Sequence, residues 1–417
     1  MKVHAASLIL TLSLLGSIPS LIAQAAAQPM RLWTNQQGRT VQASLVEISG
    51  ANVVLQLQNG TKSNVAINTL GQADQEYLKS VKTSGTPGAP AGAASIANAP
   101  LAWPAPITVN TKTLVITPGD QDEAKRNYHY QSGPFEFIAK APLAGTVMRE
   151  VAGDFELTHL AFNKLPWGWK PKPEQGDFFK VYLTETDEDF IELGGIDGSA
   201  AGSKDDYVFI KFTSIGLKKV GAKYAYDAKQ KDEGQVVGMT SRLMIGDMRI
   251  LLQPWSALGL EKFMRTVAYH NGGLSFTGLE SELKTVIKLD LATGAKPEVK
   301  GLVEYLRAGW DDQRSNVKQI RIQNFYNGLL LVYYFGFLEG DGSGARLHQY
   351  YRDVAQAAMA ERSFRETDGK SARPPGKTSA DLGLEFLNKL LAGRTDDQLK
   401  ADMITKFRGI GVKFDDE

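Results

Sequence analysis

The sequence predicts an α+β fold in which strands come first and helices follow. Short runs rich in β-branched and aromatic residues recur through residues 31–70 and 103–236, separated by Gly, Pro and Asn, and such runs are typical of strands. After residue 237 the apolar residues recur mainly at helical spacing. No repeat of fixed period is visible. We therefore expect strands and helices to occupy separate parts of the chain.

The first 27 residues predict a secretory signal peptide. Lys2 precedes an apolar stretch, and small residues of the Ala-x-Ala type follow at 23–27. Ser and Pro interrupt the apolar stretch too early for it to remain in a bilayer, and no other run has the roughly 18 apolar residues of a membrane span. We expect export through the Sec pathway to the periplasm, the cell envelope or the medium, with no stable membrane span.

The composition restricts the possible chemistry. The 417 residues include 47 Lys and Arg against 46 Asp and Glu, and no Cys. A net charge of +1 gives no reason to expect a nucleic-acid partner. Without Cys the chain has no disulfides, thiolate nucleophiles or cysteine metal sites.

Residues 30–80 predict a small β-barrel. Four strand-like runs follow one another closely, Asn59-Gly60 is a strong hairpin turn, and residues 70–78 predict a closing helical turn. Residues 81–104 are rich in Ala, Gly and Pro, which is typical of a flexible linker.

The barrel sequence resembles the first Sla-homology domain, an SH3-like barrel found in fungal endocytic adaptors and in exported bacterial proteins. The matching residues are Arg31, Trp33, Thr34, Gly38, Ala43, Leu45, Val46, Val53, Val54, Leu55, Asn59, Gly60, Leu70, Ala73, Asp74, Gln75, Tyr77 and Leu78. The resemblance implies protein binding, and Trp33 and Tyr77 are candidate ligand contacts.

The larger remainder divides into a strand-rich half, residues 105–236, and a helical half, residues 237–417. Apolar spacing in 145–165 predicts one helix within the first half, while "FIELGGI" at 190–196 is among the predicted strands. "GLLLVYYFGFL" at 328–338 is too short to span a membrane and predicts a buried helix.

The order of segments in residues 125–415 resembles exported gluzincin-type peptidases. The segments that carry this resemblance begin "FEFIAKAPLAGTVMREVAGDFEL", "FFKVYLTETDEDFIELGG", "LLQPWSALGLEKFM" and "YNGLLLVYYFGFLEGDGSG". Those peptidases need two His one helical turn apart to bind zinc, a Glu to activate water, and a third ligand from the next helix. The resemblance therefore implies a zincin-like mixed domain.

The residues of that chemistry are missing. The HExxH frame places Met244 and Met248 at the His positions and Ile245 at the Glu, while Leu258 replaces the third ligand. No His lies between residues 159 and 270, so no shifted frame supplies one. We expect no metal, no cofactor and an inactive peptidase homologue. Met244, Met248 and Leu258 are expected to line the floor of the former cleft, since the flexible Met side chain fills irregular space well. The remaining His are expected to be surface or capping residues: His129, His159, His270 and His348.

Trp167 and Trp169, in "KLPWGWKPKPEQGDFF", could form an exposed platform for sugars or proline-rich peptides. The alternative is a loop that folds back over the core. Together these features predict an exported binding or adaptor protein with a protein or peptide ligand. Two other functions stay open: an envelope hydrolase that uses carboxylates such as Glu185 and Asp187, and a structural scaffold of the envelope.

Overall fold

The computed structural model describes residues 31–36, 40–49, 52–57, 61–71, 74, 75, 78, 101–204, 207–232, 234–310, 317–368, 372–374 and 376–416. The chain divides into two compact units, residues 1–97 and 98–417. Four sequence predictions lie outside the described residues: the signal peptide, the Asn59-Gly60 turn, Tyr77 and residues 81–100 of the linker.

The first unit contains a four-stranded antiparallel sheet in the order β1-β2-β3-β4. Its elements are β1 (Arg31–Thr34), β2 (Thr40–Ser49), β3 (Asn52–Leu57), β4 (Lys62–Ala66) and the short 3-10 helix η1 (Ile67–Thr69). The register between β2 and β3 shifts between Leu45 and Glu47, as at a bulge that bends a strand. Each strand therefore pairs with the next one in sequence.

The core of the first unit is built from alternate strand residues. Trp33 is 1% exposed, and its Nε1 donates a hydrogen bond to the carbonyl of Ala43 at 3.0 Å. The Thr34 amide donates to the Asp74 carboxylate at 2.6 Å, which ties β1 to the segment after η1. Trp33 therefore belongs to the core, and its prediction as a ligand contact is wrong, because an indole on the inner face of β1 is covered by the opposing strands.

The second unit contains a six-stranded mixed sheet in the order β10-β11-β9-β8-β7-β6. Its strands are β6 (Thr117–Asp122), β7 (Asn127–Ser132), β8 (Phe135–Ala139), β9 (Phe179–Thr184), β10 (Ala201–Lys204) and β11 (Tyr207–Lys211). The three central strands β8, β9 and β11 are parallel, and the outer strands run antiparallel to their neighbours. Strand β10 forms one edge of this sheet.

Two helices pack with this sheet. Helix α3 (Gly145–Lys164) confirms the prediction for 145–165 and buries an apolar stripe that includes Val147, Val151 and Phe155. It contacts α5 (Gln235–Ile245), which also lies against β10 and β11. The sheet edge β10 and the end of α5 are thereby neighbours.

The predicted strand at 190–196 is wrong. Residues Asp187–Glu192 form a short helix, α4. Thr186 accepts a hydrogen bond from the Asp189 amide, and the Asp189 carboxylate accepts one from the Thr186 amide. This reciprocal capping box, together with three acidic residues in the first turn, favours a helix start over a strand.

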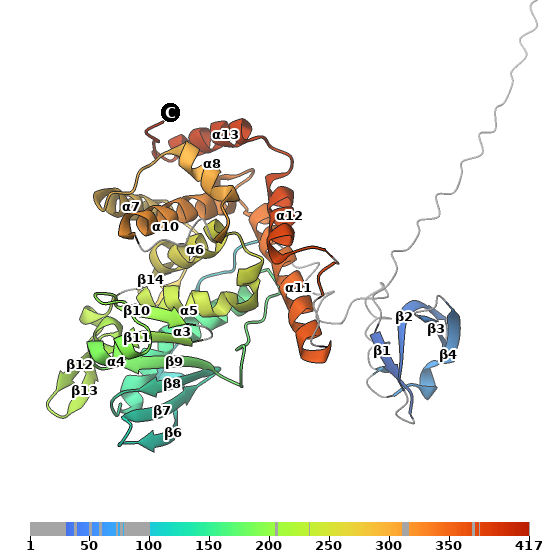
Figure 1. Cartoon of the computed structure of the whole chain (residues 1–417), viewed down its shortest axis with the longest axis horizontal. Helices are drawn as coiled ribbons and strands as arrows, with labels where there is room; N and C mark the ends of the chain where they lie inside the picture. Colours follow the sequence, from blue (N-terminus) through green and yellow to red (C-terminus); the bar gives the residue numbers. More distant parts are fainter. Residues whose placement is uncertain are drawn as a thin grey trace, which may run out of the picture. The chain divides into compact units, whose positions relative to one another are not determined.

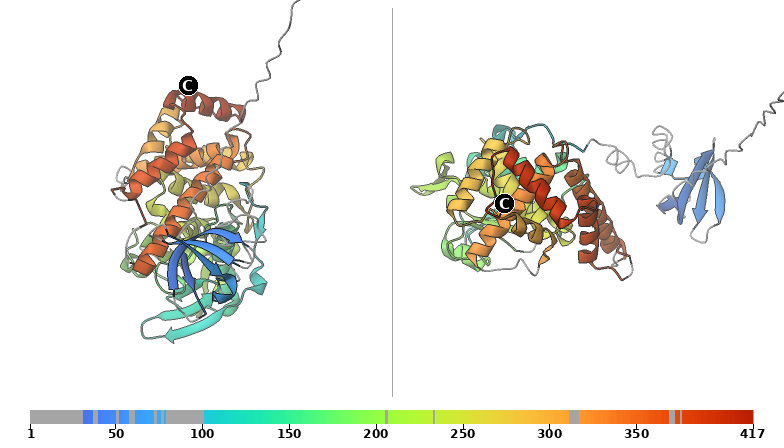
Figure 2. Two further views of the ribbon diagram at one scale, coloured as in Figure 1. Left: turned by 90° about the vertical axis from the view of Figure 1, so that its right-hand side faces the viewer. Right: turned by 90° about the horizontal axis from the view of Figure 1, so that it is seen from above.

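The rest of the chain is mainly helical, and these helices gather at one end of the unit with the sheet at the other (Figures 1 and 2). They are η5 (Gly246–Ile250), α6 (Pro254–Phe263), the π-helix η6 (Met264–Ala268), α7 (Glu280–Ala292), α8 (Val299–Arg307), α10 (Lys318–Tyr333), the π-helix η7 (Tyr334–Leu338), α11 (Ala345–Asp368), α12 (Ser379–Leu391) and α13 (Asp396–Gly409). This separation of strands from helices confirms the α+β class.

Smaller elements complete the second unit. A hairpin joins β12 (Leu217–Val220) to β13 (Lys223–Tyr226), and β5 (Ile107–Thr108), β15 (Gly273–Leu274) and β14 (Tyr269–His270) form a three-stranded sheet. Three 3-10 helices are also present: η2 (Thr111–Thr113), η3 (Phe212–Ile215) and η4 (Ala228–Gln230). In the described part of the chain, no helix combines the length and apolarity needed to cross a membrane.

Helices α6 and α10 meet at a pair of glycines. A Cβ added to Gly259 would lie 2.1 Å from the carbonyl oxygen of Gly328, and one added to Gly328 would lie 2.8 Å from the Gly259 amide nitrogen. The two backbones are thus in direct contact. Helix α10 is buried along its second half, which confirms the predicted buried helix. It also packs against α6, which in turn contacts α5.

Candidate functional site

The predicted degenerate peptidase positions lie in the core. Met244 and Met248 are fully buried, Ile245 is 2% exposed and Leu258 in α6 is half-buried. Helix α5 ends at Ile245, and Gly246 has φ 46° and ψ −128°. Residues 244–248 therefore do not form one α-helical turn, because a glycine with positive φ ends the helix within the frame. The helical frame predicted for these five residues is wrong.

The two tryptophans predicted as a platform are also buried. Trp167 is fully buried and Trp169 is 1% exposed. The Nε1 of Trp169 donates to the carbonyl of Met244 at 2.6 Å, and the ring of Trp167 stacks on Tyr351 with centroids 4.2 Å apart. The loop that carries them folds back over the core, so no exposed platform forms. Their aromatic area fills the space that an open cleft around Met244 would need.

His348 in α11 occupies an apolar site beside these tryptophans. Its ring is fully buried, Nδ1 accepts a hydrogen bond from Trp167 Nε1 at 3.1 Å, and Trp103 packs edge-on at 4.4 Å. Its Nε2 has no hydrogen-bond partner among the described residues. Burial, with a smaller effect from Arg352, lowers the pKa of His348 to about 3, because a charged imidazolium is costly in an apolar site. His348 is therefore a neutral core residue, and the prediction of a surface or capping role is wrong for it.

His348→Gln is expected to reduce the loss of unfolding free energy that the wild type shows at acidic pH. His348 has a pKa of about 3 in the folded chain and an ordinary value of 6.5 when unfolded. Between these values the unfolded chain binds a proton that the folded chain does not, so stability falls as the pH drops below 6.5. The wild-type loss from this residue at pH 5 is about 2 kcal/mol. Urea unfolding at pH 7.5 and pH 5, monitored by tryptophan fluorescence, measures this difference in unfolding free energy.

Trp167→Phe is the control for this experiment, since it removes the hydrogen bond to His348 but keeps the imidazole. It should lower stability at both pH values and keep the wild-type pH dependence. If His348→Gln and the wild type lose the same free energy between pH 7.5 and pH 5, the acid sensitivity arises elsewhere.

A charged cleft of about 300 Å³ is lined by residues that flank the buried methionines in sequence, among them Leu243, Gly246 and Asp247. We call it the charged cleft and define it by six ionisable residues of its lining: Lys172, Glu174, Arg242, Asp247, Arg249 and Arg365. They come from the loop after Trp169, from α5, η5 and α11. Four cations and two carboxylates give the lining an excess of positive charge, which favours an anionic group on a ligand.

Arg242 and Ser203, in the lining of the charged cleft, belong to a polar bridge between α5, α6 and the sheet edge. Arg242 donates to the Glu261 carboxylate through Nε at 3.0 Å and Nη2 at 2.8 Å, and its Nη1 donates to Ser203 Oγ in β10 at 3.1 Å. Glu261 is largely buried, with a side chain 10% exposed. A charged pair held by several hydrogen bonds fixes its geometry well. The bridge therefore sets the distance between the two helices and the edge strand.

Another part of the wall is organised by Asp247. Its side chain is 6% exposed and forms ion pairs with Arg362 and Arg365 of α11, the latter at 2.8 Å. The hydrogen bond to Asp247 is the largest cause that raises the pKa of Arg365. The Arg365 side chain is still about half exposed. The wall thus presents a fixed guanidinium to solvent.

The acidic run that the hydrolase hypothesis depends on has structural partners. Glu185 accepts hydrogen bonds from Arg126 at 2.8 Å, Lys219 at 3.0 Å and Tyr224. Burial alone would raise the pKa of Glu185, but the bonds from Tyr224, Lys219 and Arg126 outweigh it and lower the pKa. Asp187 pairs with Lys211 at 2.6 Å. The lowered pKa makes Glu185 a poor general acid.

The arrangement in the charged cleft suits binding more than bond cleavage. Two of its guanidinium groups, those of Arg242 and Arg365, are paired with carboxylates, and such groups recognise polar or charged ligands. Among the described residues, no three His, Asp or Glu side chains gather closely enough to bind a metal ion. Sequence reasoning singled out the segment 244–248 but missed Asp247, which stands inside it, and also Arg242 and Glu261, whose spacing of 19 residues gives no local signal.

Comparison with known families gives a match for the first unit. The family model for SLA1 homology domain 1 matches residues 22–85, the region of the four-stranded sheet. No curated protein and no solved structure matches the chain. The predicted Sla-homology domain is therefore confirmed for this part of the chain, and it is consistent with protein binding by a partner still unknown.

Proposed function

We propose that this protein is an exported, non-catalytic binding protein. Its Sla-homology unit would fold as an SH3-like barrel and bind a protein, and its larger unit would be an inactive relative of gluzincin peptidases that binds a peptide in the charged cleft. Export rests on the signal-like sequence of residues 1–27. A role as adaptor follows from joining two binding units through one linker.

The observation that carries the non-catalytic proposal is the filled space beneath the charged cleft. Met244 and Met248 are fully buried there, and Trp169 is 1% exposed. Arg242, in the lining of the cleft, and Glu261 are bonded to each other, so neither is placed to activate water. Dense apolar packing beneath paired charges stabilises a surface but offers no nucleophile or base.

The resemblance to peptidases can also be kept by aligning the HExxH motif five residues earlier in the chain. Met239, Thr240 and Leu243 then take the positions of the first His, the Glu and the second His, all within α5, where positions i and i+4 share one helix face. Leu258 follows in α6. None of the residues that take the His, Glu and third-ligand positions in the shifted frame has an ionisable side chain, so the proposal of an inactive homologue does not depend on which frame is correct.

Zinc binding and peptidase activity test the proposal. Purified full chain is expected to retain no stoichiometric zinc after incubation with zinc chloride and dialysis, as measured by elemental analysis. It is also expected not to cleave casein. Stoichiometric zinc together with casein cleavage would overturn the proposal.

Peptidoglycan serves as a second substrate, because the carboxylate hydrolase is the competing function. Release of soluble fragments by the wild type, lost in Glu185→Gln but kept in Glu280→Gln, would favour that hydrolase. Glu280 is a suitable control because it is an exposed glutamate in α7. Without any fragment release the binding function stands.

A further inference from the structure

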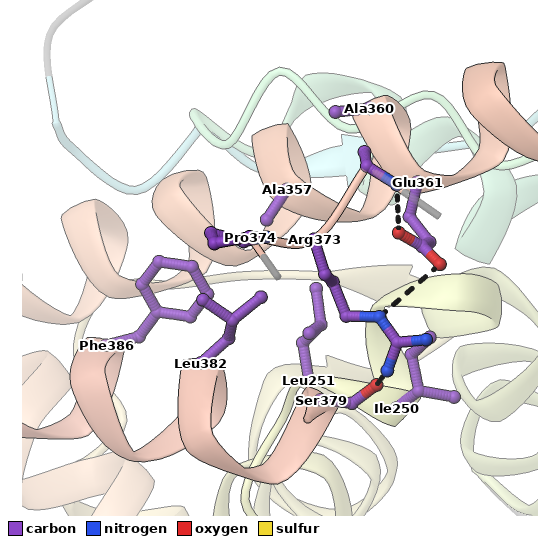
Figure 3. A pocket seen from close by; sticks show the side chains of 11 residues that line it. Ile250, Leu251, Ala357, Ala360, Glu361, Arg373, Pro374, Ser379, Leu382 and Phe386 are labelled. Atoms are coloured by element: carbon purple, nitrogen blue, oxygen red, sulfur yellow. Dashed lines mark hydrogen bonds and ion pairs between the residues drawn. The ribbon is translucent and has the colours of Figure 1, made fainter. Parts of the chain in front are cut away.

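A second cavity lies next to the charged cleft, between α11 and α12. It has a volume of about 180 Å³ and a mostly apolar lining. Leu382 and Phe386 of α12 face Ala357 and Ala360 of α11 across it, with Leu251 at its base (Figure 3). The two alanines leave the space that larger side chains would fill. We call this cavity the apolar socket.

The rim of the apolar socket is polar but nearly neutral. Glu361 accepts a hydrogen bond from the Ala372 amide at 2.9 Å and pairs with Arg373 Nε at 3.6 Å. Arg373 Nη1 donates to Ser379 Oγ at 2.9 Å (Figure 3). The two charges offset each other, so the rim does not select a charged group. The socket instead fits an uncharged apolar group.

The size of the socket points to a single side chain. An apolar cavity of about 150 Å³ accommodates a benzene-sized molecule, so 180 Å³ fits the side chain of one Leu, Met or Phe. Burying such a side chain contributes about 1.5–3 kcal/mol. That energy alone gives weak binding, and a peptide needs a second contact nearby.

The charged cleft supplies that second contact at a suitable distance. Ile250 lines both cavities and is 49% exposed, so it forms the ridge between them. Glu361 of the socket and Arg365 of the cleft are four residues apart in α11, which is about 6 Å along a helix. In an extended peptide, side chains two residues apart on one face are separated by about 7 Å. The two cavities can therefore take neighbouring same-face side chains.

We propose that the apolar socket and the charged cleft together bind one extended peptide of a partner protein. One apolar side chain enters the socket, and an acidic residue two to four positions away lies in the charged cleft, beside the exposed Lys172 and the half-exposed Arg365. The excess of cations in the cleft selects the acidic residue by charge complementarity. This inference rests on the proposed peptide-binding function and names the chemistry of its ligand.

Binding of designed peptides to the full chain tests the inference. The probes are dye-labelled Gly-Ser peptides that carry one Leu, Met or Phe and one Glu, separated by two to four positions in either order, and fluorescence anisotropy measures the affinity. At least one spacing should bind, and replacing its Glu with Gln or its apolar residue with Ser should weaken binding about tenfold, which is about 1.4 kcal/mol. No binding by any member at millimolar concentration overturns the inference.

Variants of the protein locate the binding site. Ala357→Leu fills the socket, and Lys172→Glu reverses a charge in the cleft; each should weaken the best peptide about tenfold. Ala401→Leu in α13 and Lys288→Glu in α7 make the same changes at exposed positions outside both cavities, and their affinities should stay within about twofold of the wild type. Equal losses in the controls would contradict the assignment.

Two outcomes distinguish this inference from the proposed function on which it rests. If no peptide binds but the chain neither retains zinc nor cleaves casein, the inference fails and the non-catalytic function stands. If sedimentation shows a dimer that Ala357→Leu dissociates, a second copy of the chain occupies the socket, and the peptide assignment is overturned.

Discussion

Gly259→Ala is expected to destabilise the second unit by about 3 kcal/mol or more, at the upper end of the usual cost of overpacking. The added methyl would lie 2.1 Å from the carbonyl oxygen of Gly328, and that oxygen belongs to a helix backbone that cannot rotate away. Helices α6 and α10 would have to separate. Because α6 carries Glu261, the bridge to Arg242 would be strained as well.

Gly301→Ala is the matched control. Gly301 lies within α8, and a Cβ there would find its nearest neighbours at 4.0 Å. Alanine should therefore be neutral or stabilise the protein by about 0.5–1 kcal/mol, the usual helix preference over glycine. Urea unfolding followed by tryptophan fluorescence reports mainly on the second unit, since five of the six Trp lie there. A Gly259→Ala variant as stable as Gly301→Ala would disprove the close helix contact.

Periodicity predicted the parts of the fold that depend on local pattern. The helix at 145–165 was predictable because its apolar residues recur over five turns, and the buried helix at 328–338 because few polar residues interrupt it. The strand predicted at 190–196 failed because the capping residues Thr186 and Asp189 outweigh a short apolar run. The sheet order was not predicted, since strand pairing depends on contacts distant in sequence.

The position of the candidate site in the chain could be predicted, but the burial and bonding of its residues could not. The segment 244–248 and Trp169 do meet, through the bond from Trp169 to the Met244 carbonyl. Their burial could not be read from the sequence, because an exposed tryptophan and a core tryptophan look alike. Asp247 is bonded to arginines 115 and 118 residues away, so no local motif could reveal it.

Asp154→Ala is expected to cost about 3–5 kcal/mol, the usual effect of removing one partner of a buried ion pair. Asp154 in α3 pairs with Lys231, and both side chains are close to 10% exposed. Tyr269 of β14 donates to Asp154 at 3.1 Å and accepts from Lys231 at 3.2 Å. Burial and the nearby Asp154 carboxylate raise the pKa of Tyr269 to about 12, so the tyrosine is neutral in the wild type and Asp154 carries the negative charge that pairs with Lys231.

The large loss of stability expected for Asp154→Ala depends on the burial of the Asp154–Lys231 pair. Glu280 and Lys284 form a similar pair in α7, but their side chains are 51% and 44% exposed, so Glu280→Ala should cost no more than about 0.5 kcal/mol. In the double variant Asp154→Leu with Lys231→Met no charge remains buried, and most of the stability lost in Asp154→Ala should return. Urea unfolding of the wild type and these three variants at pH 7.5 measures the differences in the free energy of unfolding. If Asp154→Ala lost no more stability than Glu280→Ala, Lys231 would have to reach solvent, and the network would not hold α3 against β14.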